Sequence, residues 1–222
     1  MTVIDVYFID VNVPGDVVDA LALLLADGEL ARANRYRFDD DRRRSIVARA
    51  AARRLLGRFL DADPRSLVIV EEEHGKPVLL HREIEFNASH SGDLVALAFA
   101  KDTPVGIDVE RRRRLHDCVA LSRRYFSAEE DDIVRSATDA EDAFFAIWTA
   151  KEAIVKASGK GIGASDLHGF TVPFRERRLL PVIGGWSVAT VDPPLDGYYG
   201  AVAARAGDRR IISRTITPAG LL

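Results

Sequence analysis

One stretch constrains the fold more than any other. Residues 139 to 158 contain no glycine or proline, and Gly159 follows directly. Apolar residues recur in this stretch at helical spacing, with Phe144, Ile147 and Ile154 on one flank. The sequence therefore predicts a long, largely apolar helix around which the rest of the chain is organised.

Two charged side chains project from one face of this helix. Glu152 and Lys156 are four residues apart, and so lie a turn from each other, whereas Lys151 points about 100° away from Glu152. A carboxylate and an ammonium on an apolar helix suit a metal-bridged phosphate, because the carboxylate holds the cation and the ammonium meets the anion. The alternative is a solvated ion pair, which is the commoner arrangement when the helix is considered alone.

The composition indicates a folded, soluble protein. The 222 residues suffice for one large domain or two small ones, 47% of them are hydrophobic, and the net charge of -3 does not indicate nucleic-acid binding. The single cysteine, Cys118, excludes an intrachain disulfide and favours a reducing compartment. Asp5 and Asp10 interrupt the N-terminal apolar run, and no apolar segment reaches membrane-spanning length. We therefore expect a cytoplasmic protein with no membrane partner.

The pattern of elements repeats along the chain. The first half is expected to contain helices at 16–26 and 39–60 and strands at 3–11, 67–70, 78–80 and 94–100. The second half is expected to contain helices at 117–124 and 139–158 and strands at 105–110, 170–174, 186–191, 198–204 and 210–217. Each half thus has helices followed by a terminal antiparallel hairpin, 94–100 with 105–110 and 198–204 with 210–217. This predicts an α+β fold of two similar α/β lobes related by pseudo-twofold symmetry, residues 1–104 and 105–222, with the active site at their interface.

A polar motif precedes the strand at 94–100. Ser89, His90, Ser91 and Gly92 lie together there, but adjacent residues on an extended backbone point to opposite faces. A serine hydrolase would also need an orienting acid and an oxyanion hole, which the sequence does not indicate. Hydrogen-bond donors to a phosphate are the better functional interpretation. A polar turn between strands is the structural alternative, and these residues alone leave both open.

Two carboxylates share one face of the strand at 105–110. Asp108 and Glu110 alternate with apolar residues, and Gly106 allows a ligand or another backbone to approach closely. Like charges on one face repel unless a cation lies between them, and oxygen ligands of this kind suit Mg²⁺. A polar outer face of an edge strand is the alternative.

Three segments occur in order at separations typical of a known family: FNASHSG at 86–92, GIDVE at 106–110 and WTAKEAIVKASGKG at 148–161. Together they resemble the 4′-phosphopantetheinyl transferase family, of the larger pseudo-dimeric type that activates peptide and polyketide synthases. The similarity extends from about Arg32 to about Pro173. It implies transfer of the phosphopantetheine arm of coenzyme A to a serine of an apo acyl or peptidyl carrier protein, with release of adenosine 3′,5′-bisphosphate.

The resemblance also implies roles for individual residues. It assigns Mg²⁺ to Asp108, Glu110 and Glu152 in the second lobe, together with the pyrophosphate of coenzyme A. Lys156 would contact that pyrophosphate, and Lys151 would orient the neighbouring carboxylates. In the first lobe, Lys76, Ser89 and His90 would bind the nucleotide end of coenzyme A, and its phosphates would be received at the positions of Arg32, Arg44 and Ser45. One basic position of the family corresponds to Glu29 here, so that contact is expected to be missing.

The chemistry needs a base and the partner needs a surface. The serine of the carrier protein must lose its proton to a base. One candidate base is Glu130, and another is Glu152 or Glu110 acting through a metal-bound water. Glu130 has a structural alternative, because Ser127 and Glu130 fit a capping box. Acidic carrier proteins would be complemented by the arginines at 111–114 and 123–124, with Tyr125 or Phe126 as an apolar contact.

The same residues are compatible with two other functions. A non-catalytic coenzyme A or nucleotide-binding protein and a Mg²⁺-dependent phosphohydrolase are the competing functions. A monomer is expected to suffice, because the pocket forms between lobes of one chain.

Overall fold

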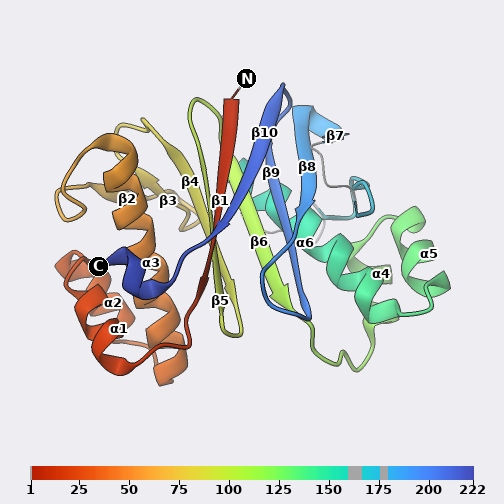
Figure 1. The fold of residues 1–222 in the computed structure, drawn as a ribbon. Helices are drawn as coiled ribbons and strands as arrows, with labels where there is room; N and C mark the ends of the chain where they lie inside the picture. The colour runs from red at the N-terminus through yellow and green to blue at the C-terminus, as the bar shows by residue number, and fades with distance from the viewer. Residues whose placement is uncertain (1, 160–166, 176–179) are drawn as a thin grey trace.

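The computed structural model describes residues 2–159, 167–175 and 180–222. Figure 1 shows two sheets side by side in the middle of the molecule, with helices on both outer flanks. One four-stranded sheet has the order β10-β1-β5-β4 and the other has the order β6-β9-β8-β7, while β2 and β3 form a separate two-stranded sheet.

The first lobe begins with a long strand and three helices. Its elements are β1 (Thr2–Asp10), α1 (Gly15–Ala22), α2 (Asp27–Ala33), α3 (Asp39–Leu60), β2 (Ile69–Glu71), β3 (Pro77–Leu79), β4 (Glu85–Ser91) and β5 (Leu94–Ala100). The elements that follow are β6 (Val105–Arg111), α4 (Cys118–Tyr125), α5 (Ala128–Ser136), α6 (Ala140–Ser158), β7 (Leu180–Val182), η1 (Ile183–Gly185), β8 (Trp186–Val191), β9 (Tyr198–Arg205), β10 (Arg209–Thr215) and η2 (Pro218–Leu221). None of the helices in these described ranges is both long and apolar enough to cross a membrane.

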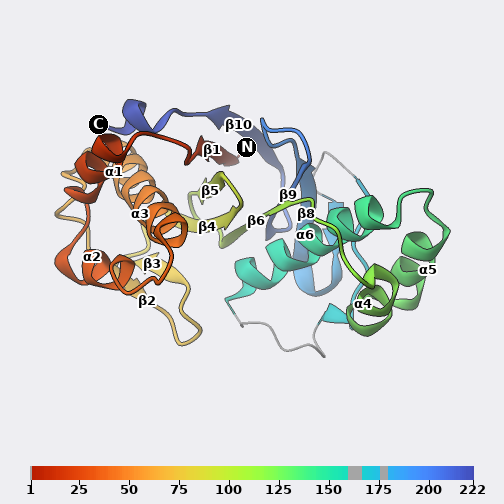
Figure 2. The ribbon, with the colours of Figure 1, turned by 90° about the horizontal axis from the view of Figure 1, so that it is seen from below.

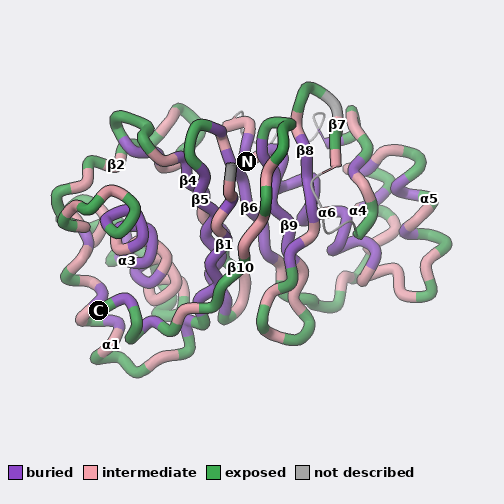
Figure 3. Tube along the Cα trace, turned by 45° about the horizontal axis from the view of Figure 1, so that its top comes forward, coloured by how far each residue is buried: buried purple, intermediate pink, exposed green. Residues whose placement is uncertain are grey.

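The molecule has four layers, helix, sheet, sheet and helix, which Figure 2 shows from below. One apolar core lies between α1–α3 and the first sheet, and another lies between α4–α6 and the second sheet. A third core lies between the sheets, where Val6 of β1 joins Ile107 of β6. Both faces of β1 and β5 are therefore buried, as the purple strands in the centre of Figure 3 show.

The two lobes repeat one connectivity. In the first, β1 pairs antiparallel with β5 and β5 with β4; in the second, β6 pairs antiparallel with β9 and β9 with β8. The helices occupy the same place in both orders, between the first strand and the later ones. The α+β class with two similar lobes is confirmed, and the pseudo-twofold relation between them stays a prediction.

The two expected hairpins are wrong. β5 pairs with β4 and β1, whereas β6 lies in the other sheet beside β9. β10 pairs in parallel with β1, with Ile211 opposite Ile4, so the last strand completes the sheet of the first lobe. Arg54 of α3 then binds the carbonyl oxygens of Leu221 and Leu222. A boundary between residues 104 and 105 therefore assigns the strands up to β9 to their own sheets, whereas β10 belongs to the sheet of the first lobe.

Two further expectations differ from the structure. The helix expected at 16–26 is shorter, because α1 ends at Ala22 and α2 begins at Asp27. Residues 170–174 form no strand. Their backbone groups are bound by side chains, since Lys151 binds the carbonyl oxygen of Phe170 and Glu130 binds the N–H of Val172.

The long helices agree with the sequence pattern. α6 begins after the cap Asp139 and ends at Gly159, which has a left-handed φ of 69°. Ser127 and Glu130 form the expected capping box of α5. Lys160 and Gly161, at the end of the third family-like segment, lie outside the described residues.

Candidate active site

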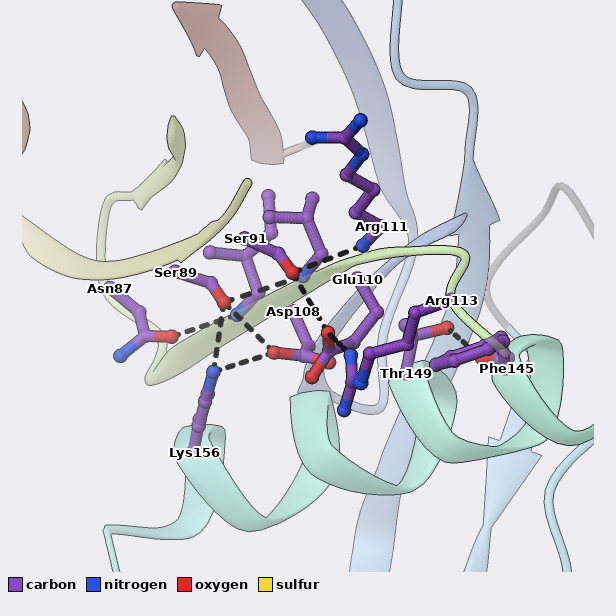
Figure 4. Close-up of polar contacts among 12 residues, drawn as sticks. Asn87, Ser89, Ser91, Asp108, Glu110, Arg111, Arg113, Phe145, Thr149 and Lys156 are labelled. Atoms are coloured by element: carbon purple, nitrogen blue, oxygen red, sulfur yellow. Dashed lines mark hydrogen bonds and ion pairs between the residues drawn. The ribbon is translucent and has the colours of Figure 1, made fainter. Parts of the chain in front are cut away.

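β6 crosses α6 at close range because Gly106 has no side chain. A Cβ at this position would lie 2.1 Å from the carbonyl oxygen of Ala153 and 2.3 Å from the backbone nitrogen of Ala157. Both separations are far below a van der Waals contact, so only glycine fits here. The close approach brings Asp108 of the strand to Lys156 of the helix (Figure 4).

Side chains of β4 take the place of a neighbouring strand along the edge of β6 (Figure 4). Backbone N–H groups of Ile107, Val109 and Arg111 donate to Asn87 Oδ1 at 2.9 Å, Ser89 Oγ at 3.3 Å and Ser91 Oγ at 3.0 Å, respectively. Alternate residues of a strand share a face, so the pattern Asn-x-Ser-x-Ser offers its side chains to alternate residues of β6. These contacts join the two lobes along the strand that carries the acidic pair.

Asp108 lies at the centre of this junction and is only 3% exposed. Its Oδ1 accepts hydrogen bonds from Ser89 Oγ at 2.8 Å and from Lys156 Nζ at 2.6 Å. Its Oδ2 is buried and has no hydrogen-bond partner among the described residues. Burial raises the pKa of Asp108, and the adjacent ammonium of Lys156 opposes that effect.

Glu110 lies two residues further along the same face of β6. Its Oε2 accepts from Ser91 Oγ at 2.9 Å and from a guanidinium nitrogen of Arg113 at 2.9 Å. The guanidinium of Arg113 also lies over the ring of Phe145, 5.4 Å from its centroid. Glu110 is therefore held through one oxygen, at the rim of the junction.

Glu152 reaches the same place from α6 and is 4% exposed. Burial and the negative charges of Asp108 and Glu110 raise the pKa of Glu152, and the positive charge of Lys156 opposes them. The resulting pKa is about 7. Its Oε1 is buried without a hydrogen-bond partner in the described part of the chain. Asp108, Glu110, Glu152 and Lys156 therefore lie close enough together for their charges to influence the two buried carboxyls.

The donor set fits a hard divalent cation, although no group of three His, Cys, Asp or Glu side chains in the described ranges is arranged to hold a metal ion. Mg²⁺ prefers a few carboxylate oxygens and retains waters. The buried Oδ2 of Asp108 and Oε1 of Glu152 lack partners, which is costly unless a positive group approaches them. The ammonium of Lys156 contacts Oδ1 of Asp108 and leaves Oδ2 without a partner, so a cation between Oδ2 and the buried Oε1 of Glu152 would compensate both oxygens.

Comparison with known proteins identifies the family. A model described as "4'-phosphopantetheinyl transferase, N-terminal" matches residues 15–102, and one described as "4'-phosphopantetheinyl transferase superfamily" matches residues 104–183. The chain is 35% identical over 201 residues to the 4'-phosphopantetheinyl transferase HetI of Nostoc sp., covering 88% of this chain and 84% of that protein. The chain belongs to the 4′-phosphopantetheinyl transferase superfamily.

Shorter matches to this superfamily agree. The chain is 36% identical over 151 residues to the transferase psf-1 of Bacillus pumilus, and 28% identical over 144 residues to the transferase Sfp of Bacillus subtilis. These matches cover 66% and 64% of this chain, and 62% of each relative, less than two thirds of its length. The expected family and enzyme class are thereby confirmed.

Lys151 of this transferase lies in a separate buried cluster. Its Nζ is 2.7 Å from Glu130 Oε2, and neither side chain has exposed surface. The same nitrogen donates to the carbonyl oxygen of Leu167 at 2.7 Å and to that of Phe170. An ammonium has three N–H donors, so these acceptors use all of them. Lys151 orients Glu130, and no described contact joins it to the carboxylates on β6.

Glu130 has the contacts of a structural residue. Its Oε2 accepts from the backbone N–H of Ser127 at 2.9 Å, and its Oε1 accepts from that of Val172 at 2.8 Å. A general base must reach the substrate hydroxyl. With no exposed surface and every close contact internal, Glu130 is poorly placed for that role, and the capping alternative explains its position.

Two of the expected coenzyme A contacts line one cavity. Lys76 and Lys156 both face a space of about 290 Å³ next to the junction. Lys76 Nζ donates to the carbonyl oxygen of Val105 at 3.1 Å and to that of Ala157 at 3.4 Å, and burial lowers its pKa. Lys76 therefore ties the turn before β3 to both β6 and α6.

Arg32 and Ser45 line a different cavity, of about 510 Å³, between α2, α3 and β2. Arg32 is paired with Glu71. Glu29 pairs with the buried Arg53 at 2.6 Å and with Arg49 at 3.4 Å. Acidic partners thus balance the arginines of this cavity.

Arg44 and His90 lie near the turn after β4. Arg44 donates to the carbonyl oxygen of Gly92 at 3.0 Å and pairs with Asp41 at 2.5 Å. Desolvation by the surrounding protein lowers the pKa of His90, although the residue as a whole is exposed, and the charges of Arg44 and Lys156 add to this. The expected coenzyme A residues thus border more than one cavity, and their roles stay predictions.

Sequence reasoning missed Asn87, Ser91 and Arg113. The first two stand in the quoted motif but received no role, and Arg113 was counted only as part of a basic run. The available signal was the alternation of Asn87, Ser89 and Ser91, which places short polar side chains on one face of a strand. This alternation indicates a role only when β6 is known to lie opposite these side chains.

Proposed function

We propose that this transferase moves the 4′-phosphopantetheine arm of coenzyme A to a serine hydroxyl of an apo acyl or peptidyl carrier protein. The observation that carries the proposal is the cluster of Asp108, Glu110, Glu152 and Lys156 at the junction of the lobes, in a chain of this superfamily. Such a cluster suits a reaction at a pyrophosphate, because it combines an ammonium with oxygen ligands for a cation.

The reaction breaks a phosphoanhydride bond of coenzyme A and forms a phosphodiester bond to the carrier serine. The serine oxygen forms a bond to the β-phosphorus of coenzyme A, and the bond from that phosphorus to the bridging oxygen breaks. Adenosine 3′,5′-bisphosphate leaves with the electron pair, and the proton of the serine passes to a carboxylate. Positioning and charge neutralisation supply most of the catalysis in such transfers.

Lys156 supplies the fixed positive charge. Its Nζ donates a hydrogen bond to Asp108 Oδ1 at 2.6 Å, and its side chain borders the cavity that Lys76 also lines. We infer that this ammonium meets the pyrophosphate of coenzyme A and stabilises the charge that grows on the leaving bisphosphate.

Asp108, Glu110 and Glu152 would hold Mg²⁺, and the unpartnered oxygens of Asp108 and Glu152 fit that role. When bound, the ion neutralises charge on the pyrophosphate and its leaving group. The proton acceptors that fit are Glu152 and Glu110, each acting through a metal-bound water. Glu130 is not proposed as the base.

The carrier protein would dock on the arginine-rich side of the second lobe. Residues 111–114, Arg123 and Arg124 are exposed there. Arg111 and Arg112 pair with Asp93 and Asp139, so acidic groups of the chain already balance part of this charge. Phe126 is fully buried in the core, which leaves the half-buried Tyr125 as the apolar contact of the two residues considered.

Mass spectrometry of an apo carrier protein tests the proposal. Incubation with the enzyme, coenzyme A and Mg²⁺ should add the mass of the phosphopantetheine arm to the carrier serine. Binding of coenzyme A without any change in carrier mass would identify a non-catalytic binding protein. Release of phosphate without a carrier would instead identify a phosphohydrolase. Light scattering of the enzyme should give the mass of one chain, because one chain contains both lobes.

A further inference from the structure

Two serines of β4 each touch both the backbone and a carboxylate of β6. Ser89 Oγ accepts from Val109 N–H and donates to Asp108 Oδ1 at 2.8 Å. Ser91 Oγ accepts from Arg111 N–H and donates to Glu110 Oε2 at 2.9 Å. Asn87 makes the same kind of backbone contact, at Ile107, but no carboxylate follows it.

The backbone contact fixes the direction of each hydroxyl. A serine hydroxyl has one proton to donate and lone pairs that accept. Because Ser91 Oγ already accepts from Arg111 N–H, its proton is left to point at Glu110. The register between the lobes thereby sets the orientation of a carboxylate.

Glu110 has more need of such a support than Asp108. The side chain of Asp108 is 5% exposed and is enclosed by the junction, whereas that of Glu110 is 21% exposed and lies at the rim. Its other described contact, Arg113, comes from an arginine whose side chain is 59% exposed. Long exposed side chains hold a partner weakly, because ordering them costs entropy. Ser91, on a strand, is the rigid contact of the two.

We propose that Ser91 is a positioning residue that holds Glu110 beside Asp108 in the orientation required for a divalent cation. The inference rests on the proposed function, since it assigns a use to the carboxylates considered there. It distinguishes Ser91 from Asn87, which ties the same two strands together without orienting an acid.

The test compares Ser91→Ala, Ser91→Thr and the control Asn87→Ala. Magnesium chloride is titrated into enzyme saturated with coenzyme A, and the thermal unfolding midpoint is followed. Loss of the group that orients a metal ligand typically weakens metal affinity by 10–100-fold. Ser91→Ala should therefore raise the magnesium concentration of half-maximal stabilisation by about tenfold. Ser91→Thr retains the hydroxyl and should restore the wild-type value, and saturating magnesium should restore the transfer rate of Ser91→Ala.

Asn87→Ala should lower the unfolding temperature without magnesium but leave the magnesium midpoint unchanged. An unchanged midpoint in Ser91→Ala, or equal shifts in Ser91→Ala and Asn87→Ala, would overturn the inference. If the wild-type enzyme transfers the arm with magnesium and Ser91→Ala responds to it normally, only the inference fails. If the wild type neither responds to magnesium nor labels a carrier, the proposed function fails and the inference fails with it.

Discussion

Lys156 forms an ion pair with Asp108 across the contact between α6 and β6, with 2.6 Å between Nζ and Oδ1. One partner comes from a helix and the other from a strand that is 48 residues earlier in the chain. The pair therefore depends on everything that fixes the helix against the strand.

The acidic cluster can be tested by removing one charge without changing its shape. Asp108→Asn or Glu152→Gln should lower the rate of carrier labelling by roughly a hundredfold or more, which is the usual loss of a transition-state contact. The fold should persist, because the side chain of Lys156, the partner of Asp108, is partly exposed to water and Glu152 has no ion-pair partner among the described residues. Circular dichroism and mass spectrometry of the carrier measure the two effects. Normal labelling by either variant would remove the acid from the proposed site.

Gly106→Ala tests the contact between β6 and α6. The added methyl group would overlap the backbone of Ala153 and Ala157, and strain of this kind costs about 1–3 kcal/mol of unfolding free energy. Labelling activity should fall as well, because the strand would shift relative to Lys156. Gly28→Ala is the matched control, since a Cβ there meets nothing within 4 Å. Urea denaturation compares the two, and equal stabilities would contradict the close approach.

Glu130→Gln separates structure from chemistry. Removing one partner of a buried ion pair costs about 3–5 kcal/mol, because it leaves the charge of Lys151 without its carboxylate. Material that remains folded at low temperature should still label the carrier. The neighbouring Glu129→Gln is exposed and should change stability little. A stable Glu130→Gln enzyme with no activity would favour the catalytic role for Glu130 instead.

His90 predicts a dependence of stability on pH. Its pKa in the folded protein lies below the ordinary value, so below about pH 6.5 the unfolded chain binds a proton that the folded chain does not. Stability should therefore decrease as the pH falls from 7 to 5.5. His90→Gln should remove part of this decrease, which thermal unfolding at several pH values measures. An identical pH profile in the variant would show that the histidine titrates alike in both states.

Local signals in the sequence were sufficient for the helices. The caps Asp139 and Ser127 and the terminal Gly159 act within one turn of the chain, so α5 and α6 could be predicted from neighbouring residues. The strand that pairs with β10 could not be predicted, because the apolar pattern of β10 fits the edge of either four-stranded sheet. Only the folded chain shows that Ile211 lies opposite Ile4 rather than in a hairpin with β9.

The site was predicted less completely than the fold. The spacing of Asp108 and Glu110 shows that they share a face, and the helical spacing of Glu152 and Lys156 shows the same for that pair. Glu130 and Lys151 carry the same kinds of charge, and the sequence cannot tell that they are buried against each other. The role of Ser91 depends on which strand lies across from it, which is a property of the tertiary structure.

The pairing of β10 with β1 has a consequence for how the protein is made. A ribosome releases β1 long before β10, yet the two are neighbours in one sheet. The first lobe thus waits, with one sheet edge uncovered, until nearly all of the second has been synthesised. The halves should not work as separately expressed pieces cut after residue 104, since the N-terminal piece would lack a strand that only the C-terminal piece contains.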